Sequence, residues 1–278
     1  MENPQSAIPA RHLPASARPW QAGREAQPRR TGSGEAGGRN PQSATGVAAV
    51  IAGAGQGTRM GSEARKQYMM LGNRPVLAHT LLAFEKCDAI EEIFLVIPRG
   101  DDPLCKKEII DPLRPNKPIH LISGGATRQE SVYNGLKAID GRFGLVVIHD
   151  GVRPLVKIDR IAECVRVAEK YGGCILAVAA SDTIKTVDEH DRVIVTMKRH
   201  MIRMAQTPQA FYYNLIRGAH EAAQKEACVG TDDAELVELC GEVVKVIPGD
   251  PYNIKITTPE DLKLAEALLA VYSFSGSR

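Results

Sequence analysis

The sequence predicts an α/β fold in which helices cover both faces of a mainly parallel, twisted sheet. Short apolar runs alternate along the chain with segments of helical periodicity, which is the pattern of βαβ units. Glycine-rich or charged clusters follow several of these runs, and ligand sites in parallel sheets lie beyond the carboxyl ends of the strands. One stretch breaks the alternation and has the pattern of a β-hairpin.

The first half of the predicted sheet begins at residues 47–52, an apolar run that ends in glycines and is typical of a buried strand. Residues 75–86 predict a helix with a proline at its first turn, where a missing N–H costs little. Apolar runs at 93–97 and 119–122 predict two more strands, and residues 128–139 have a helical pattern.

The second half continues the alternation. Residues 145–148 predict a strand, 158–171 a helix and 175–179 another strand. Near the end of the chain, residues 243–247 predict a strand and 259–271 a strongly periodic helix.

The exceptional stretch consists of two β-prone segments, 183–187 and 193–197, on either side of a polar turn. A hairpin does not fit inside a doubly wound sheet, so we expect residues from about 181 to 203 to project as an arm. It could remain a surface hairpin on its own subunit. An isolated two-stranded ribbon is marginal in water, which favours packing on a second subunit.

The composition excludes several classes of protein. Of 278 residues, 44% are hydrophobic and 24% charged, which suits a globular protein. The net charge of +2 is too small to indicate nucleic acid or an anionic membrane as a partner. No run approaches the roughly 20 apolar residues that span a bilayer. The six cysteines form no CxxC pair, which favours reduced thiols in a cytoplasmic protein.

Residues 1–45 differ from the rest of the chain. They hold six arginines, six prolines and no apolar periodicity. We therefore expect a disordered N-terminal extension, followed by one domain over residues 46–273. A functionless extension and an organelle transit peptide, which would direct the protein to a plastid, both remain open. A secretory signal does not, because the segment lacks an apolar core.

A glycine-rich turn over residues 53–57 follows the first predicted strand. Its glycines allow close backbone approach to a phosphate, and Arg59 and Lys66 add two positive charges nearby. The turn lacks the GK[ST] of a Walker A loop, and its GxGxG spacing differs from the dinucleotide fingerprint. A tight β-to-α turn is the plain alternative, but the two cations favour a bound triphosphate.

Two further clusters follow predicted strands. Gly124 and Gly125 precede a helix that Thr127 could cap, with Arg128 and Ser131 one turn apart on that helix. The plain alternative is an ordinary glycine turn and cap.

The second of these clusters lies at residues 149–154. Asp150 ends an apolar strand, where a carboxylate needs a partner or a metal. Arg153 could pair with it in a structural ion pair or could bind a substrate phosphate. His149 is expected to be packed or hydrogen-bonded rather than catalytic.

Other polar segments occur further along the chain, at residues 182–185, 199, 206–209, 231–233 and 253–262. The sequence Thr231-Asp232-Asp233 has an N-cap signature, and its two acids could be solvated residues of a first helical turn. Lys255 lies in a short apolar segment and would be buried unless it meets an anion.

Together these clusters resemble the 2-C-methyl-D-erythritol 4-phosphate cytidylyltransferase family of the non-mevalonate isoprenoid pathway. The resemblance runs from about Val47 to Val271 and rests on ordered motifs: GxGxRM, KQY, GGxxRxxSVxNGL, HDxxRP, DTIK, QTPQ, TDD and NIKITTPEDL. It implies a Rossmann-like nucleotidyltransferase sheet whose hairpin arm embraces the second subunit of a homodimer. It also implies transfer of CMP from CTP, with Mg²⁺ or another divalent cation held mainly by the CTP phosphates and not by a protein metal site.

The resemblance also implies roles for the matching residues. The catalytic cations would be Arg59, Lys66 and Lys255; the nucleotide-binding residues would be Gly53, Ala54, Gly55, Gly57, Gly125 and Ser131; and the substrate-binding residues would be Asp150, Arg153, Thr183, Arg199, Thr207 and Thr231. Thr183 and Arg199, on the arm, would reach the sugar phosphate bound at the neighbouring subunit.

The chain departs from the family pattern at three places. Arg65 stands where the family usually has proline, Ala52-Gly53 replaces Pro-Ala, and Lys198 stands where an acid is common. Arg65 and Lys198 are expected to add charge near the anion sites.

Three rival functions are compatible with parts of the sequence. A ribitol 5-phosphate cytidylyltransferase would share these motifs, but Lys185 in DTIK favours methylerythritol phosphate. A non-catalytic nucleotide-binding protein is disfavoured because Arg59, Lys66 and Lys255 are all retained. The glycine spacing disfavours an NAD-dependent dehydrogenase.

Overall fold

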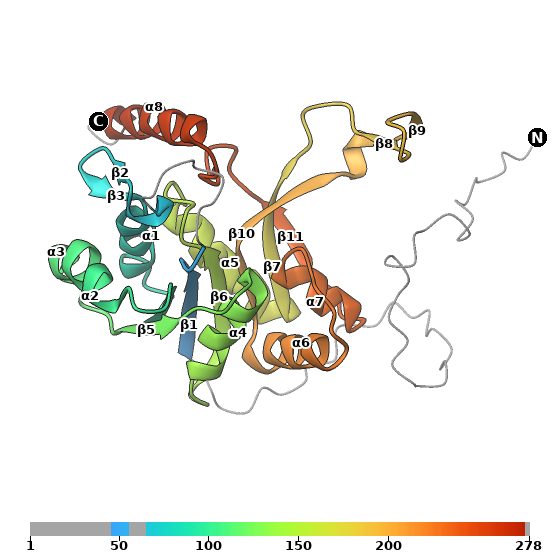
Figure 1. Cartoon of the computed structure of the whole chain (residues 1–278). Coiled ribbons are helices and arrows are strands. Elements are labelled where there is room, and N and C mark those ends of the chain that lie inside the picture. The colour runs from blue at the N-terminus through green and yellow to red at the C-terminus, as the bar shows by residue number, and fades with distance from the viewer. Residues whose placement is uncertain (1–45, 56–64, 276–278) are drawn as a thin grey trace, which may run out of the picture.

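The computed structural model describes residues 46–55 and 65–275. Within them, seven strands form one sheet in the order β11-β7-β10-β6-β1-β4-β5 (Figure 1). Every neighbouring pair is parallel except the two that β10 makes, with β6 and β7. The predicted α/β fold with a mainly parallel sheet is confirmed, whereas the predicted extension at residues 1–45 lies outside the described residues.

The strands of this sheet have the following bounds: β1 (Gly46–Ala52), β4 (Glu92–Ile97), β5 (Ile119–Ser123), β6 (Phe143–Asp150), β7 (Gly173–Ala179), β10 (Arg203–Tyr212) and β11 (Lys245–Pro248). A small separate pair joins β2 (Met70–Leu71) to β3 (Arg74–Pro75).

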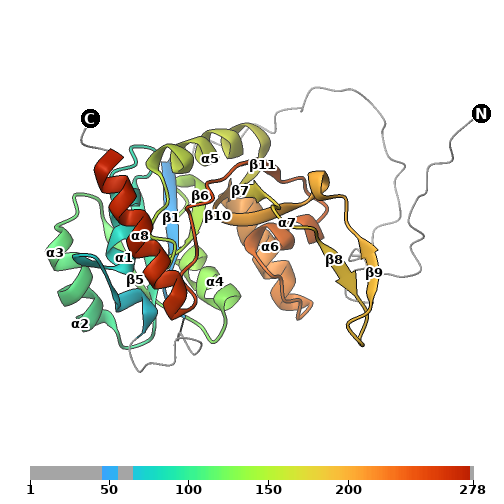
Figure 2. The ribbon, with the colours of Figure 1, turned by 90° about the horizontal axis from the view of Figure 1, so that it is seen from above.

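Helices pack on both faces of the sheet (Figure 2). One face carries α1 (Val76–Glu85) and α5 (Ile158–Tyr171). Three short consecutive segments lie beside α1: α2 (Asp102–Cys105), η5 (Lys106–Ile110) and α3 (Asp111–Leu113). The other face carries α4 (Arg128–Ala138), α6 (Tyr213–Lys225) and α7 (Asp233–Leu239). Alternation along β1 explains this: Ala49 and Ile51 pack in one core cluster, Ala48 and Val50 in the other.

The C-terminal helix α8 (Pro259–Ser275) packs on a third, smaller apolar cluster. That cluster joins Leu71, Val152, Ile256 and Ala265, each almost fully buried. It therefore brings together three segments that lie near candidate site residues: the one after Lys66, the turn after Asp150 and the segment that contains Lys255. No helix in the described ranges is long and apolar enough to cross a membrane.

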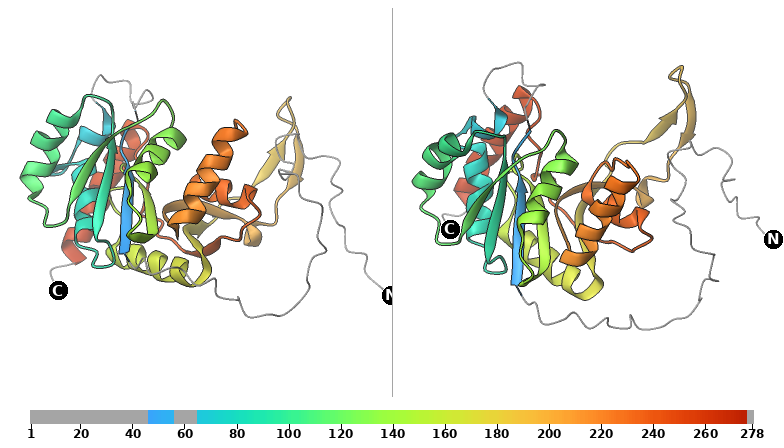
Figure 3. Two further views of the ribbon diagram at one scale, coloured as in Figure 1. Left: turned by 90° about the horizontal axis from the view of Figure 1, so that it is seen from below. Right: turned by 60° about the horizontal axis from the view of Figure 1, so that its bottom comes forward.

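The predicted hairpin is present as β8 (Lys185–Val187) and β9 (Val193–Thr196), which form their own two-stranded sheet. The short 3₁₀ helix η6 (Arg199–Met201) follows, and β10 then returns the chain to the main sheet. Both views in Figure 3 show this arm standing clear of the helices. Its apolar side chains are uncovered, with Ile194 67% exposed.

The apolar pattern did not predict β10, because polar side chains and a proline occupy its middle. Gln206, Thr207 and Gln209 are all buried there, and the pairing with β7 shifts register between Gln206 and Gln209. The predicted strand at 243–247 is displaced to β11, since Val243 is 73% exposed and precedes the strand.

Candidate active site

Three glycine turns meet where β1, β5 and β6 end. The backbone N–H groups of Gly53, Gly124 and Gly151 each donate to a carbonyl oxygen of the neighbouring strand, at 2.8 to 2.9 Å. A Cβ atom on Gly124 would lie 2.3 Å from the Cβ of Ala54, a separation that no side chain tolerates. Glycine at this position therefore lets the turn after β5 lie directly against the predicted nucleotide turn after β1.

Ser131 fixes the glycine turn after β5. Its hydroxyl accepts from the backbone N–H of Gly125 at 3.1 Å and donates to the carbonyl of Thr127 at 2.8 Å. Thr127 in turn caps α4, because its hydroxyl accepts from the backbone N–H of Glu130 at 3.1 Å. The predicted cap is confirmed, and Ser131 and Gly125 form one rigid corner.

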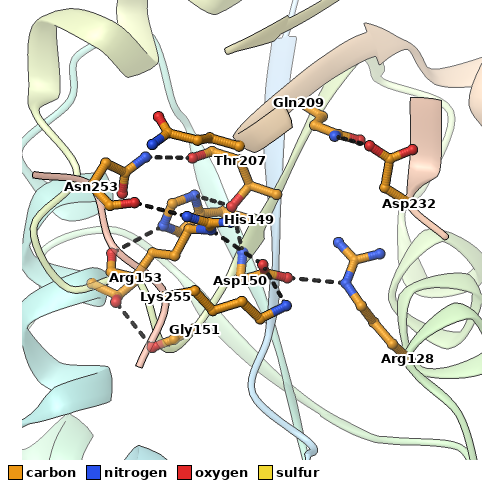
Figure 4. A network of polar contacts seen from close by, with 12 residues as sticks. Arg128, His149, Asp150, Gly151, Arg153, Thr207, Gln209, Asp232, Asn253 and Lys255 are labelled. Carbon is orange, nitrogen blue, oxygen red and sulfur yellow. Dashed lines mark hydrogen bonds and ion pairs between the residues drawn. The ribbon is translucent and has the colours of Figure 1, made fainter. Parts of the chain in front are cut away.

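Asp150, the last residue of β6, lies among three cations that come from three different segments (Figure 4). Nε of Arg128 lies 3.0 Å from its Oδ1. Nζ of Lys255 lies 3.0 Å and Nε of Arg153 3.4 Å from its Oδ2. We call these four residues the Asp150 cluster. The predicted partner Arg153 is present, and so is the anion that Lys255 was expected to need.

The electrostatics of the cluster favour an ionised carboxylate. Burial alone would raise the pKa of Asp150, but Arg128, Lys255 and Arg153 outweigh it and hold that pKa well below its usual range. Burial lowers the pKa of Arg153, and Asp150 opposes this shift. Lys255 is the most exposed of the three cations, at 36% of its side chain. The cluster therefore presents positive charge at the surface of the site.

Arg128 also bridges to a second buried carboxylate, that of Asp233 at the start of α7, at 2.8 Å. His220 lies behind, with Nε2 3.2 Å from the other oxygen of Asp233. Asp233 is 1% exposed, so the alternative in which both acids of the TDD motif are solvated does not hold for this residue. Arg128 and Asp233 were not predicted as site residues, although both lie in motifs that carry the family resemblance.

Thr207 and Asn253 hold the cluster from the side of β10. The hydroxyl of Thr207 accepts from the backbone N–H of Asp150 at 3.0 Å. The side-chain amide of Asn253 donates to the carbonyl of Thr207 at 2.8 Å, and the carbonyl of Asn253 accepts from Arg153 at the same distance. Both residues are almost fully buried, so Thr207 acts on the site through the backbone of Asp150.

Thr231 lies near this group without joining it. Its backbone N–H and its hydroxyl both donate to one oxygen of Glu235, at 2.6 and 2.8 Å. The N-cap of α7 is the next residue, Asp232, whose other oxygen accepts from Gln209 in β10 at 2.8 Å. Thr231 therefore sits where β10 meets α7, and no hydrogen bond or ion pair among the described residues joins it to the Asp150 cluster.

Arg59 and Gly57 lie outside the described residues, so the predicted convergence of Arg59, Lys66 and Lys255 stays a prediction. Lys66 is half-buried and opens the 3₁₀ helix η4 (Lys66–Tyr68), which ends three residues before the buried Leu71 of the third cluster. Arg65 forms an ion pair with Asp101, which neutralises the charge that it was expected to add near an anion.

The two predicted residues of the arm lie apart from the cluster. Thr183 precedes β8, and Arg199 opens η6 and donates to the carbonyl of Ser181 at 2.8 Å. No hydrogen bond or ion pair within the described ranges connects either residue to the Asp150 cluster, and the arm projects outward beyond β7 and β10 (Figure 1). Their role across a subunit interface stays a prediction.

Comparison with known proteins gives a consistent result. A family model described as IspD, 2-C-methyl-D-erythritol 4-phosphate cytidylyltransferase, matches residues 47–271. The enzyme of that name from Geobacter metallireducens is 45% identical over 226 residues, which is 80% of this chain and 97% of the relative. The enzyme from Geotalea uraniireducens is 46% identical over 225 residues, 80% of this chain and 96% of the relative.

Solved structures agree with the sequence relatives. The 4-diphosphocytidyl-2C-methyl-D-erythritol synthase of Anaerococcus prevotii superposes with a TM-score of 0.74 at 35% identity, covering 82% of this chain and 97% of that one. The 2-C-methyl-D-erythritol 4-phosphate cytidylyltransferase of Thermus thermophilus superposes with a TM-score of 0.66 at 32% identity, covering 80% and 98%.

Proposed function

The chain belongs to the 2-C-methyl-D-erythritol 4-phosphate cytidylyltransferase family, and we propose that the carboxyl edge of its sheet, with the Asp150 cluster, forms the site of that reaction. The protein is a nucleotidyltransferase that transfers CMP from CTP to 2-C-methyl-D-erythritol 4-phosphate, in non-mevalonate isoprenoid biosynthesis. The products are 4-diphosphocytidyl-2-C-methyl-D-erythritol and pyrophosphate. The relatives reported above give no support to the ribitol 5-phosphate alternative.

The observation that carries the proposal is the concentration of cations around Asp150, at the edge where three glycine turns meet. The three cations of the cluster carry three positive charges, and the carboxylates of Asp150 and Asp233 carry two negative charges. The net charge of this group is therefore +1. A phosphate of the substrate can take up that charge. Cationic side chains fixed in advance are worth most where charge develops in the transition state.

The reaction follows from this arrangement without a strong general base. The phosphate oxygen of methylerythritol phosphate is already an anion, and it attacks the α-phosphorus of CTP. The new P–O bond forms while the bond to the β-phosphate oxygen breaks, and pyrophosphate leaves. Positioning and charge neutralisation then account for most of the catalysis.

We assign roles to the predicted residues accordingly. The phosphates are neutralised by Lys255, Lys66 and Arg59. The pocket for the sugar phosphate is shaped by Asp150 and Arg153, with Thr207 and Thr231 around them. The cytidine end of the site is formed by Gly53, Ala54, Gly55, Gly57, Gly125 and Ser131. The packing of Gly124 on Ala54 supports the last assignment, because it places the corner of Ser131 and Gly125 beside the turn after β1.

The proposal includes Mg²⁺ or another divalent cation bound to the phosphates of CTP, where it would neutralise part of the triphosphate charge. The surroundings of Asp150 support a metal held by the nucleotide. Cations contact both oxygens of this carboxylate, so it is a poor metal ligand. Among the described residues, no group of three or more His, Cys, Asp or Glu side chains could hold an ion.

We further propose one catalytic domain over residues 46–273 that acts in the cytoplasm. All six cysteines are free thiols, which fits a reducing compartment. A plastid address through residues 1–45 is the alternative, and those residues lie outside the described structure.

The function is tested by pyrophosphate release from CTP and Mg²⁺. We expect rapid release with methylerythritol 4-phosphate and at least ~100-fold slower release with ribitol 5-phosphate, since a misplaced acceptor loses that much. A Lys66→Ala variant serves as the control for catalysis by this site. Faster turnover of ribitol phosphate would reverse the choice of substrate, and equal release by parent and Lys66→Ala would remove the proposed site.

We also propose that the protein is a homodimer held by the arm, residues 181–203. The arm is a two-stranded ribbon with exposed apolar side chains, and such ribbons need a partner for stability. Light scattering should give a mass of twice the 30.1 kDa chain. Ile194→Asp should shift the protein towards monomer, whereas Val243→Asp, equally exposed but outside the arm, should not. A monomeric parent, or equal effects of both variants, would contradict the proposal.

A further inference from the structure

His149 lies directly before Asp150 and is fully buried, and its ring forms hydrogen bonds with groups other than that carboxylate. Its Nε2 lies 3.2 Å from the carbonyl oxygen of Arg153, and its Nδ1 lies 3.0 Å from the hydroxyl of Thr207. The imidazole also packs against Phe84, with 5.1 Å between the ring centroids. The ring therefore spans the turn that carries two members of the Asp150 cluster.

The direction of each hydrogen bond follows from the chemistry of the groups. A carbonyl oxygen accepts, so Nε2 of His149 carries the proton that is donated to Arg153. Burial lowers the pKa of His149 to about 3, which keeps the ring neutral and leaves Nδ1 as an acceptor. The hydroxyl of Thr207 therefore donates to Nδ1. Its oxygen, in turn, accepts from the backbone N–H of Asp150 at 3.0 Å.

The bonds form a closed path around the turn. It runs from the N–H of Asp150 through Thr207 and His149 to the carbonyl of Arg153, and a 3.0 Å bond from the N–H of Arg153 to the carbonyl of Asp150 closes the turn itself. Asn253 holds Thr207 from the other side. His149, Asp150 and Thr207 are buried, and each polar atom on this path is paired, so loss of one member leaves another unsatisfied.

We propose that His149 is a positioning residue of the transfer reaction: it acts through Thr207 and the carbonyl of Arg153 to hold the side chains of Asp150 and Arg153 in place. The proposal rests on the proposed function, in which those two side chains surround the sugar phosphate. The cytidine end of the site lies on β1, β5 and α4. These elements contact the turn through the pairing of β1 with β6 and through Arg128, but Gly53, Gly125 and Ser131 form their hydrogen bonds with groups other than His149 and Thr207. Misplacement of the turn should therefore affect one substrate more than the other.

The test uses variants that keep one half of the imidazole. His149→Phe keeps the ring volume against Phe84 but loses both hydrogen bonds. His149→Gln can still donate towards the carbonyl of Arg153, and His149→Asn can still accept from Thr207. The matched control is His120→Phe, which removes another hydrogen-bonded histidine, 44% exposed on β5 and away from the turn.

We expect His149→Phe to lower kcat/KM for methylerythritol phosphate ~30-fold, with KM for CTP unchanged, and the Gln and Asn variants to recover part of the loss. His120→Phe should match the parent. A change confined to the yield of folded protein, with parental constants for what remains, would overturn the proposal. So would an equal loss in all three His149 variants, because rescue depends on the retained bond.

Two further measurements distinguish a positioning role of His149 from other roles. The pH profile of kcat/KM between pH 6 and 9 should keep its shape in His149→Phe, since the ring is neutral throughout. Loss of a limb of the pH profile would assign proton transfer to His149 and overturn the proposal.

The double variant His149→Phe, Thr207→Val should lose little more kcat/KM than the worse of the two single variants. Additive losses would show that the two residues act independently. An inactive parent would refute the proposed function itself, whereas an active parent with unaffected variants would refute only this inference.

Discussion

Asp150→Asn is expected to remove most of the activity and to destabilise the fold as well. Asparagine keeps the shape of the side chain but loses the charge that Arg128, Arg153 and Lys255 surround. Removing one partner of a buried ion pair costs about 3 kcal/mol or more. We expect a loss of that size in the free energy of unfolding, measured by urea titration. The cations should also shift, so kcat/KM should fall ~100-fold.

Asp140→Asn is the matched control for this change. Asp140 also pairs with an arginine, Arg142, at 3.2 Å, but its side chain is 61% exposed. Exposed pairs contribute little, so this variant should stay within about 0.5 kcal/mol of the parent. A parental melting curve and parental turnover for Asp150→Asn would show that the Asp150 cluster is dispensable.

The same carboxylate predicts how stability depends on pH. The pKa of Asp150 in the folded protein is held below its unfolded value, which is about 3.9. Its contribution is therefore fully present above that value and is lost as the pH falls towards the lower, folded pKa. Asp233, which Arg128 also holds below its usual pKa despite burial, acts in the same direction. Below about pH 4 the parent should lose stability more steeply than Asp150→Asn.

Lys255→Met is expected to have a large effect on turnover rather than on stability. The ammonium group lies 3.0 Å from Asp150, and its side chain is 36% exposed, so a phosphate can reach it. Loss of a fixed donor that stabilises transition-state charge costs ~100- to 1,000-fold in kcat. Methionine keeps most of the aliphatic length, and a pair with a partly exposed lysine contributes little to folding.

Lys263→Met provides the comparison for Lys255→Met. Lys263 is an exposed lysine on α8, eight positions further along the chain. Initial rates of pyrophosphate release and melting temperatures of both variants would be compared with the parent. If Lys255→Met turned over as fast as Lys263→Met, the cation would have no role in the reaction.

The sequence predicted the parallel part of the sheet well because buried strands and amphipathic helices leave local patterns. β1, β4 and β7 were found from apolar runs, and α4 and α8 from helical periodicity. The arm was found because its two segments surround a polar turn. In contrast, β10 was missed, since the strand buries glutamines and a threonine whose partners are side chains and backbone groups elsewhere in the chain.

The residues of the candidate site show the same difference between local patterns and long-range contacts. Local pattern marked Asp150 and Lys255, because each is a charged residue next to an apolar strand or segment, and it marked Arg153 as a possible partner of Asp150. The family resemblance then implied their roles in the site. Arg128 and Asp233 were not selected, because their ion pair joins positions 105 residues apart. Arg65 was expected to add charge near an anion site, but it pairs with Asp101. That partner lies 36 positions further along the chain, beyond α1 in the sequence, so no local pattern indicates it.

The sequence by itself determined the class of fold, the order of the motifs and the identity of the charged residues. These depend on periodicity and spacing within about one helix or one strand. The tertiary structure alone decided which charges meet, that Asp150 is shared by three cations, and that His149 and Thr207 close the turn beneath it. Such contacts depend on which strands lie side by side, and the β10 strand that supplies Thr207 enters the sheet between β6 and β7 through long-range pairing that leaves no local pattern.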